Sequence, residues 1–234
     1  DTLTIVTSLP GPGFWNGSDS DPTKITDGYE YDMAKLLQEK LGMKNLEVRN
    51  ENFDAIVAGQ AGEYDLALSQ VTITDERAKV VDFTTPYFAS DQGVFVKAGT
   101  KVPDLAAAKK LLWGVQTATT GLDFVTGTIK PDKEPQVFQS LADAFTALTA
   151  GQVDAVMMDT AIVLAEAAKS GGKLEVAGQF KTGESYGGIL PKGSKNKTKI
   201  DEVIKGLETD GTLGKLAEKY LGGDPSKVPV IPVG

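Results

Sequence analysis

The chain of 234 residues is long enough for one large domain or two small ones, and it carries a net charge of -8 at pH 7 with a sequence pI of about 4.7. This acidic balance argues against nucleic acid or an anionic lipid surface as a partner, because both are bound by clustered Lys and Arg. Cysteine and histidine are absent, which excludes thiol nucleophiles, disulfides, thiolate metal sites and imidazole acid–base catalysis. We therefore expect no metal and no cofactor, and only carboxylates remain as candidate catalytic groups.

No apolar run approaches the ~20 residues that a membrane-spanning helix needs. A strand-like pattern starts almost at the first residue, at positions 3–7. We expect a mature soluble protein from which any signal peptide is absent.

Strand and helix patterns alternate through the first half of the chain, which indicates βαβ units and a mostly parallel sheet. A loop rich in Pro and Gly at residues 10–13 separates the first strand from the first helix and leads into Phe14 and Trp15. The predicted elements are a strand at 3–7, a helix at 31–41, a strand at 46–48, a short helix at 53–61 and a strand at 64–68.

The same kind of pattern starts again in the second half. Ser140 and Asp143 predict a capped helix start, with Asp in place of the usual Glu or Gln of a capping box. The tail at 225–232 is expected to be extended and to pack on a surface. The predicted elements are strands at 93–96, 111–116 and 186–190 and helices at 103–110, after the loop 117–121, at 141–150, around 200–211 and at 213–220.

A weak internal repeat relates residues 62–70 to residues 151–159. In both, an amphipathic helix is followed by Gly, Asp, an apolar strand and a polar exit, so that Gln70 corresponds to Asp159. One explanation is that any two βαβ units look somewhat alike. The other is a pair of similar lobes, and if these face each other a ligand could lie between Arg77 and Asp159.

The polar segment 69–77 follows the predicted strand at 64–68. Its side chains are expected at the carboxyl end of that strand, where open α/β sheets bind ligands. Arg77 supplies a planar, permanently charged fork suited to a carboxylate, and Thr72 supplies a hydroxyl. The alternative is a surface ion pair of Arg77 with its acidic neighbours, which would contribute little.

Several short motifs stand out along the chain: GYEYD at 28–32, FDAI at 53–56, TITDER at 72–77 and DFTTPY at 82–87. On these motifs the whole chain resembles the bacterial solute-binding proteins of polar amino-acid ABC transporters, family 3. GYEYD parallels the family's Gly-Phe-Asp-x-Asp. The Thr-Ile-Thr-x-Glu-Arg run followed by Phe-Thr-x-Pro-Tyr is the more specific signal.

The resemblance implies an α/β fold of the type II periplasmic-binding-protein class. In this fold two lobes, each a mostly parallel sheet flanked by helices, close on one ligand held in the cleft between them. The resemblance places residues 1–93 and 188–234 in lobe 1 and residues 94–187 in lobe 2. Hinge bending is then expected near Gly93 and near the pair Gly187 and Gly188.

The resemblance also implies how the α-carboxylate of a ligand is bound. The arginine matching Arg77 grips this group with help from the hydroxyl matching Thr72. The loop matching Thr119, Thr120 and Gly121 offers backbone N–H groups at a helix N-terminus, an arrangement that favours an anion on physical grounds as well.

For the remainder of the ligand, the aspartate matching Asp159 takes the α-ammonium, and the backbone carbonyl of Gln70 is a second acceptor. Phe53 and an aromatic of the first loop, either Phe14 or Trp15, would sandwich the ligand's side chain. The alternatives are a core position for Phe53, a surface anchor for Trp15 and a helix N-cap for Asp159, and the N-cap role is compatible with ligand binding.

Two departures from the family bear on the ligand. Cationic-amino-acid binders tend to carry an aspartate after the first strand, where this chain has Ser8. Glutamine binders tend to carry a lysine after the strand of lobe 2, where this chain has Gln116. We expect a pocket that is polar and uncharged at the side-chain end.

The leading expectation is a monomeric, non-enzymatic binding protein that captures a free polar L-amino acid and delivers it to an ABC transporter permease. It would be periplasmic or extracellular, with lipid anchoring to the cell membrane as an option. The alternatives are a receptor domain that senses an amino acid and a dehydratase of a small carboxylic acid. That enzyme would have to use carboxylates such as Glu30 or Asp123.

Overall fold

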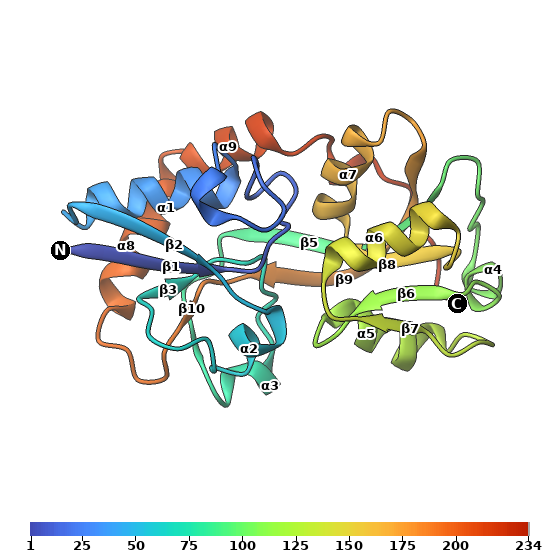
Figure 1. Cartoon of the computed structure of the whole chain (residues 1–234), viewed down its shortest axis with the longest axis horizontal. Helices are drawn as coiled ribbons and strands as arrows, with labels where there is room; N and C mark the ends of the chain where they lie inside the picture. Colours follow the sequence, from blue (N-terminus) through green and yellow to red (C-terminus); the bar gives the residue numbers. More distant parts are fainter. Residues whose placement is uncertain (234) are drawn as a thin grey trace. The chain divides into compact units, whose positions relative to one another are not determined.

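The computed structural model describes residues 1–233, which fold into two compact units (Figure 1). Unit 1 consists of Asp1–Ala89 and Glu184–Tyr220, and unit 2 consists of Ser90–Gly183 and the segment from Leu221 onward. Each unit holds one five-stranded sheet with helices around it. The predicted α/β class is confirmed.

The sheet of unit 1 has the strand order β2-β1-β3-β10-β4. Strand β1 runs parallel to both β2 and β3, whereas β10 is antiparallel to its neighbours β3 and β4. The strands are β1 (Thr2–Thr7), β2 (Asn45–Asn50), β3 (Leu66–Ala67), β4 (Asp82–Phe83) and β10 (Ile189–Leu190).

The sheet of unit 2 has the order β7-β6-β8-β5-β9. Here β6 runs parallel to β7 and β8, and β5 is antiparallel to β8. The strands are β5 (Phe88–Lys97), β6 (Trp113–Gln116), β7 (Gln136–Phe138), β8 (Ala155–Asp159) and β9 (Leu174–Tyr186).

The two sheets repeat one pattern, in which the first parallel strand lies between the second and the third and an antiparallel strand follows. The register agrees as well, because Ile5 pairs with Leu66 in unit 1 as Trp113 pairs with Ala155 in unit 2. The weak repeat in the sequence therefore corresponds to a structural repeat.

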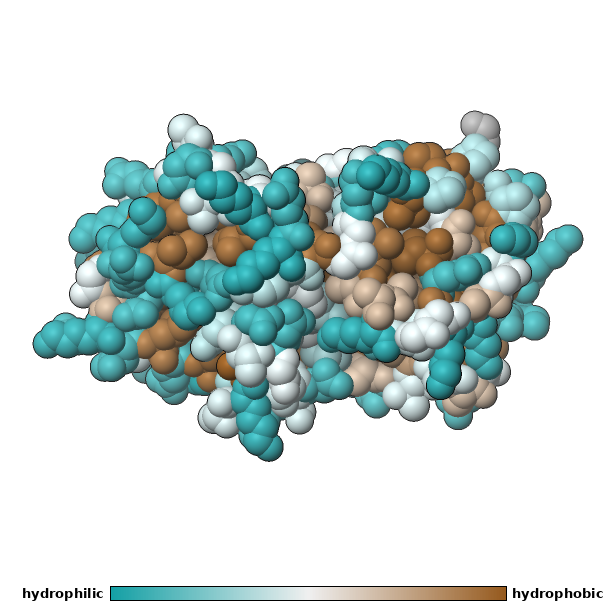
Figure 2. Space-filling model, turned by 90° about the horizontal axis from the view of Figure 1, so that it is seen from above, coloured by the Kyte–Doolittle hydropathy of each residue, from teal (hydrophilic) through white to brown (hydrophobic). Residues whose placement is uncertain are grey.

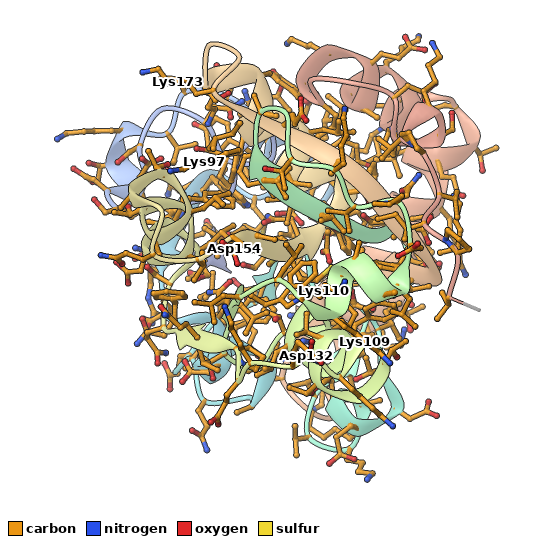
Figure 3. All side chains as sticks on the ribbon, turned by 90° about the vertical axis from the view of Figure 1, so that its right-hand side faces the viewer. Lys97, Lys109, Lys110, Asp132, Asp154 and Lys173 are labelled. Carbon is orange, nitrogen blue, oxygen red and sulfur yellow. The ribbon has the colours of Figure 1, made fainter. Side chains whose placement is uncertain are left out.

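One aspartate fixes this register in each unit. Asp65 Oδ2 accepts from the Thr4 N–H at 2.8 Å, while the Asp65 N–H donates to the Thr4 carbonyl at 3.0 Å. Asp154 makes the same pair of bonds with Leu112 in unit 2, both at 2.8 Å. Figure 3 labels Asp154. The Asp of the repeated motif is thus a structural residue that joins the third parallel strand to the first.

Except for the short helix at 75–78, the helices of unit 1 each bury apolar residues. The helix at 29–40 buries Met33, Ala34 and Leu37 and exposes Lys35, Glu39 and Lys40. One of its charged residues, Glu30, is buried as well. The helices of this unit are α1 (Tyr29–Lys40), α2 (Phe53–Val57), α3 (Asp75–Ala78), α8 (Lys197–Thr209) and α9 (Thr212–Tyr220), with a 3-10 turn η1 (Pro22–Lys24).

The helices of unit 2 surround a core that includes Trp113, Met157, Phe180 and Ile231. Ser140 caps α6 by accepting from the Asp143 N–H at 3.2 Å, which confirms the predicted helix start. The helices are α4 (Leu105–Lys109), α5 (Thr120–Phe124), α6 (Leu141–Ala150) and α7 (Thr160–Lys169), with a π-helical turn η2 (Val125–Ile129) after α5 and a 3-10 turn η3 (Pro225–Lys227).

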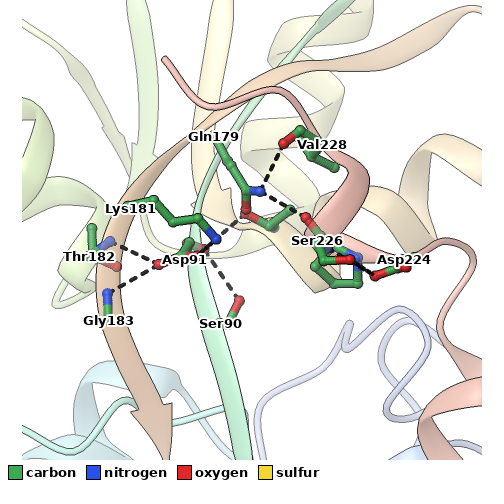
Figure 4. A network of polar contacts seen from close by, with 11 residues as sticks. Ser90, Asp91, Gln179, Lys181, Thr182, Gly183, Asp224, Ser226 and Val228 are labelled. Atoms are coloured by element: carbon green, nitrogen blue, oxygen red, sulfur yellow. Dashed lines mark hydrogen bonds and ion pairs between the residues drawn. The ribbon is translucent and has the colours of Figure 1, made fainter. Parts of the chain in front are cut away.

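The segment from Leu221 onward packs on unit 2, although the family resemblance placed it in lobe 1. Gln179 on β9 holds this segment, because its side-chain amide donates to the carbonyls of Pro225 (2.7 Å) and Val228 (3.0 Å) (Figure 4). Ile231 then enters the core and is 3% exposed. The tail was expected to be extended throughout, but its first residues form the turn η3.

The unit boundaries also differ from the expected ones. The chain passes between units at 89/90 and at 183/184, rather than at 93/94 and 187/188. Two strands make these crossings, β5 and the long β9. No prediction was made for β9, because its polar residues and glycines hide the alternation of a strand.

Hydrophilic residues cover much of the face shown in Figure 2, with hydrophobic residues visible between them. Within residues 1–233 no helix combines the length and the hydrophobicity needed to cross a bilayer.

Candidate functional site

Polar side chains follow the parallel strands of unit 1 at their carboxyl ends. Ser8 lies directly after β1, and its N–H donates to Ser69 Oγ at 2.9 Å. Gln70 and Thr72 follow β3 and are 7% and 4% exposed. Such strand ends are where open α/β sheets bind ligands.

Arg77 lies in the short helix α3, which Thr74 caps by accepting from the Arg77 N–H at 3.2 Å. Its Nη1 donates to the Thr72 carbonyl at 2.8 Å. Its guanidinium carbon lies 5.5 Å from the ring centroid of Phe53, within the range of a cation–π contact. The Thr72 carbonyl and the Phe53 ring thus orient the guanidinium, while Glu76 pairs with Lys79.

Phe53 opens α2 and is 7% exposed. It is therefore mostly a core residue, as the alternative interpretation had it, but one face of its ring lies under the Arg77 guanidinium. The structure thus brings Thr72, Arg77 and Phe53 together in unit 1.

Glu30, in the first turn of α1, is fully buried and accepts four hydrogen bonds. Trp15 Nε1 donates at 2.7 Å and the Gln70 backbone N–H at 2.8 Å. The Gln70 side-chain amide and the Tyr87 hydroxyl are the other two donors. Burial raises the pKa of the Glu30 carboxyl, and the hydrogen bonds from Tyr87, Gln70 and Trp15 oppose this rise.

The aromatics of the first loop point into unit 1. Phe14 is fully buried against the rings of Tyr29, Phe88 and Tyr186. Trp15 is 1% exposed, and its Nε1 also donates to the Leu68 carbonyl at 3.1 Å. Both rings are therefore core residues of unit 1, which differs from the expectation that one of them lines a pocket.

In unit 2 the candidate residue Asp159 ends strand β8 and is 4% exposed. Gln92 on β5 donates from Nε2 to Asp159 Oδ1 at 2.9 Å and to Thr120 Oγ1 at 3.1 Å. Asp159 occupies the N-cap position of α7, but its side chain makes no capping hydrogen bond. Its carboxylate is therefore oriented by Gln92.

The loop after β6 leads into α5. Thr119 is the N-cap and accepts from the Leu122 N–H at 3.2 Å, while its hydroxyl donates to the Gln116 carbonyl at 2.7 Å. The Gln116 side chain donates to the Gln139 carbonyl at 3.3 Å. The helix start lies close to β8, since a Cβ added at Gly121 would lie 3.0 Å from the Met157 carbonyl oxygen.

The structural repeat relates these residues to those of unit 1. Because Ile5 and Trp113 hold equivalent register positions, Ser8 corresponds to Gln116, three residues further along each strand. Gln70 corresponds to Asp159 in the same way, five residues after the paired aspartates Asp65 and Asp154. Each unit thus presents polar groups at the same two strand ends.

Two residues of this arrangement were not predicted as parts of the site. Glu30 lies inside the GYEYD motif but was considered only as a catalytic candidate, and nothing in the sequence links it to Gln70. Gln92 lies in β5, where no motif marks it, and only the antiparallel pairing of Gln92 with Asp159 brings them together.

Comparison with known proteins identifies relatives along most of the chain. Residues 18–223 match the family model of the bacterial extracellular solute-binding proteins, family 3. The L-cystine-binding protein TcyJ of Escherichia coli K12 is 29% identical over 239 positions, covering 96% of this chain and 85% of that protein. The ABC transporter glutamine-binding protein GlnH of Bacillus subtilis is 30% identical over 210 positions, covering 86% and 75%.

Solved structures agree in fold. An ancestral arginine-binding protein bound to glutamine has a TM-score of 0.83 and 32% identity, covering 95% of this chain and 98% of that one. An ancestral amino acid-binding protein described as a precursor of cyclohexadienyl dehydratase has a TM-score of 0.81 and 29% identity, covering 94% and 95%. The resemblance noted from the motifs is confirmed, and the chain belongs to the bacterial extracellular solute-binding proteins of family 3.

Proposed function

We propose that this protein captures a free L-amino acid outside the cytoplasm and passes it to the permease of an ABC transporter. The observation that carries the proposal is a pair of oriented, opposite charges, Arg77 on helix α3 of unit 1 and Asp159 at the end of β8 in unit 2. Arg77 is held by Thr72 and Phe53, and Asp159 is held by Gln92. An amino acid is a zwitterion and needs one group of each sign.

In this proposal Arg77 binds the α-carboxylate. A guanidinium can make two parallel hydrogen bonds to a carboxylate, and its orientation by Thr72 and Phe53 reduces the entropy lost on binding. The hydroxyl of Thr72 and the backbone at Thr119, Thr120 and Gly121 would add donors.

Asp159 binds the α-ammonium, with the backbone carbonyl of Gln70 as a second acceptor. Each charge-assisted hydrogen bond contributes roughly 1.5–3 kcal/mol, so these contacts together support at least micromolar affinity. Because residues of both units bind the same molecule, the ligand favours the closed conformation.

The ligand's side chain is expected to be polar and uncharged. The equivalent strand ends carry Ser8 in unit 1 and Gln116 in unit 2, and neither can neutralise a charged side chain. We further propose that the protein acts as a monomer, periplasmic or extracellular, with lipid anchoring to the cell membrane as an option.

A thermal-shift scan against the twenty common L-amino acids tests this function. A ligand at ~100 times its Kd adds about 2.7 kcal/mol to the stability, which corresponds to a shift of about 5–10 °C for a protein of this size. We expect the largest shifts with neutral polar amino acids. No shift with any of the twenty would overturn the proposal.

The chain offers a matched control, because Arg49 is its one other arginine. Arg49 bonds to Glu51 and to the carbonyls of Ala61 and Glu63 in unit 1. Arg77→Lys keeps the charge but removes the fork, so it should abolish most of the ligand-induced shift. Arg49→Lys makes the same chemical change and should leave that shift intact; equal behaviour of the two variants would remove Arg77 from the site.

The second candidate function, a dehydratase, draws on the ancestral neighbour described as the precursor of such an enzyme. Its candidate carboxylates fit poorly here, because Glu30 is buried and Asp123 is exposed on α5. Incubating the protein with a small cyclic carboxylic acid that carries a hydroxyl leaving group, and assaying for elimination of water, separates the two. We expect no turnover.

A further inference from the structure

The buried carboxylate of Glu30 stands out among the titratable groups, because the proposed ligand contacts do not include it. Four N–H or O–H groups donate to its two oxygens. Trp15 lies in the first loop, Gln70 follows β3, and Tyr87 directly precedes β5, the strand that crosses from unit 1 to unit 2. Glu30 therefore joins three separate parts of unit 1.

All of these partners are donors, so the acceptor-only form of the side chain suits them. An ionised carboxylate has about four lone-pair positions, and each is matched by one donor. A glutamine at this position would direct an NH2 group at two of these donors. The geometry thus selects a carboxylate at position 30.

Gly28 explains how Glu30 reaches this position. At φ +137° it precedes α1, and an added Cβ would lie 2.2 Å from the Phe14 carbonyl oxygen. That carbonyl accepts from the N–H groups of Glu30 and Tyr31, both at 3.2 Å. Glycine at 28 therefore lets the first loop close over the start of α1, which aims Glu30 at Gln70.

Gln70 has an unusual backbone. Its φ of 48° lies in the left-handed region, which residues other than Gly, Asn and Asp rarely adopt. Glu30 accepts from both the backbone N–H and the side-chain amide of this residue. Two bonds from one carboxylate to one residue fix its backbone and turn its side chain inward.

The backbone on either side of Gln70 belongs to the candidate site. The Ser69 hydroxyl accepts from Ser8, and the Thr72 carbonyl orients Arg77. A change in φ at Gln70 would turn its own carbonyl and shift Thr72. The direction of the ligand-facing groups after β3 thus depends on the conformation of one residue.

We propose that Glu30 is a positioning residue for ligand binding, which holds Gln70 in the left-handed conformation so that the backbone of residues 69–72 faces the ligand. This inference rests on the proposed function. It assigns the Gln70 side chain to Glu30 and leaves the Gln70 carbonyl to the ligand. Burial of a carboxylate is costly, and a residue retained only for packing would be better replaced by an apolar one.

Glu30→Gln tests the inference, with affinity measured by calorimetry against each of the twenty common L-amino acids. We expect the Kd of the best-bound amino acid to rise 10- to 100-fold while the circular dichroism spectrum stays that of the wild type. In the ligand-free protein, exchange of the Gln70 amide hydrogen should become faster. Tyr29→Phe is the control, because it removes another buried hydrogen bond of this cluster, to the Tyr87 carbonyl at 3.0 Å, without touching Gln70.

A second substitution separates positioning from stability. Glycine adopts a positive φ without strain, so Gln70→Gly in the Glu30→Gln background should recover part of the lost affinity. If Glu30 had a purely structural role, the losses of affinity caused by Glu30→Gln and by Gln70→Gly would add in the double variant. If Glu30→Gln does not fold, the single variants Gln70→Ala and Gln70→Gly give the same test. The Gln70→Gly variant should then bind the preferred amino acid at least several-fold more tightly than the Gln70→Ala variant.

The possible results distinguish this inference from the function on which it rests. If the wild type binds no amino acid, both are overturned. If the wild type binds one and Glu30→Gln binds it with an unchanged Kd, only the positioning role is overturned. Additive losses in the double variant, or a Tyr29→Phe variant with the same rise in Kd, would also overturn it.

Discussion

Units 1 and 2 share one strand order and one aspartate pairing, but they end their third parallel strand differently. In unit 1 the exit residue Gln70 is turned inward by a carboxylate from α1. In unit 2 the exit residue is itself a carboxylate, Asp159, which an amide from β5 orients. The same pair of group types, an amide and a carboxylate, thus occurs at both exits with the roles exchanged.

This exchange determines which charge each unit presents. The carboxylate of unit 1 is surrounded by donors and fully buried, so Arg77 is the oriented charge beside that exit. In unit 2 the carboxylate ends the strand itself. A duplicated scaffold therefore fixes where groups are placed, while neighbours from other elements decide their sign.

The largest expected effect comes from removing the negative charge of unit 2. Asp159→Asn should weaken binding of the preferred amino acid about 100-fold, because it removes charge-assisted bonds worth roughly 1.5–3 kcal/mol each. Isothermal titration calorimetry with the amino acid and with its deaminated analogue measures the effect. The variant should no longer distinguish the two compounds.

Asp143→Asn is the matched control for this variant, since Asp143 also lies in unit 2 and its carboxylate only accepts from the capping Ser140 hydroxyl at 2.7 Å. Its affinity should stay unchanged. An Asp159→Asn variant that still prefers the amino acid over the deaminated analogue would remove the contrast between the units.

A second prediction concerns the residue after each exit, Val71 in unit 1 and Thr160 in unit 2. Both are fully buried, but the Thr160 hydroxyl lies 3.0 Å from Gln179 Oε1 and 3.1 Å from the Asp91 carbonyl oxygen, and these two acceptors share its one donor proton. Thr160→Val gives unit 2 the residue of unit 1 and leaves buried acceptors without their donor. We expect a loss of about 2 kcal/mol in urea unfolding.

Thr160→Ser keeps the hydroxyl and should retain most of this stability. The tail from Leu221 onward should become easier to cleave by protease in the valine variant, because Gln179 also binds Pro225 and Val228. Equal stability of the valine and serine variants would mean that the hydroxyl contributes nothing to unit 2.

Much of this organisation could be predicted from the sequence, because it depends on local patterns. The helix α6 was predicted with its bounds and its cap, and the strand ends were identified from apolar runs followed by polar residues. Local patterns did not predict the contacts of Glu30 and Gln92 or the long strand β9. Their contacts join residues 40 to 67 positions apart or depend on strand pairing, which a local pattern does not encode.

The two units also differ in the antiparallel strand beside the third parallel strand, which is β10 beside β3 in unit 1 and β5 beside β8 in unit 2. In unit 1 this is the apolar pair Ile189 and Leu190, whereas in unit 2 the strand β5 carries Asp91. Asp91 accepts from the N–H groups of Thr182 (2.8 Å) and Gly183 (3.1 Å) and pairs with Lys181 at 2.8 Å (Figure 4). Burial alone would raise the pKa of this carboxyl, but these bonds lower it below its usual range.

A lowered folded-state pKa means that Asp91 stabilises the protein above the unfolded pKa of about 3.9 and loses this effect as the pH falls through the folded value. Asp91→Asn should therefore cost about 1–2 kcal/mol at pH 7. The difference from the wild type should shrink steadily below pH 4. A difference that does not vary with pH would show that shape, and not charge, holds β5 to β9.

The smallest effects are expected at the aspartates that the units share. Asp65 is half-buried and Asp154 is exposed, yet each accepts a backbone N–H at 2.8 Å across the first and third parallel strands. Asp65→Asn should cost about 1 kcal/mol in urea unfolding and Asp154→Asn about 0.5 kcal/mol, because water competes more strongly for an exposed bond. Neither variant should change the affinity for an amino acid, since both residues lie at the opposite end of the strand from the polar exit. A ligand Kd that rises in either variant would mean that the register of the parallel strands, and not only the residues at their ends, determines the geometry of the site.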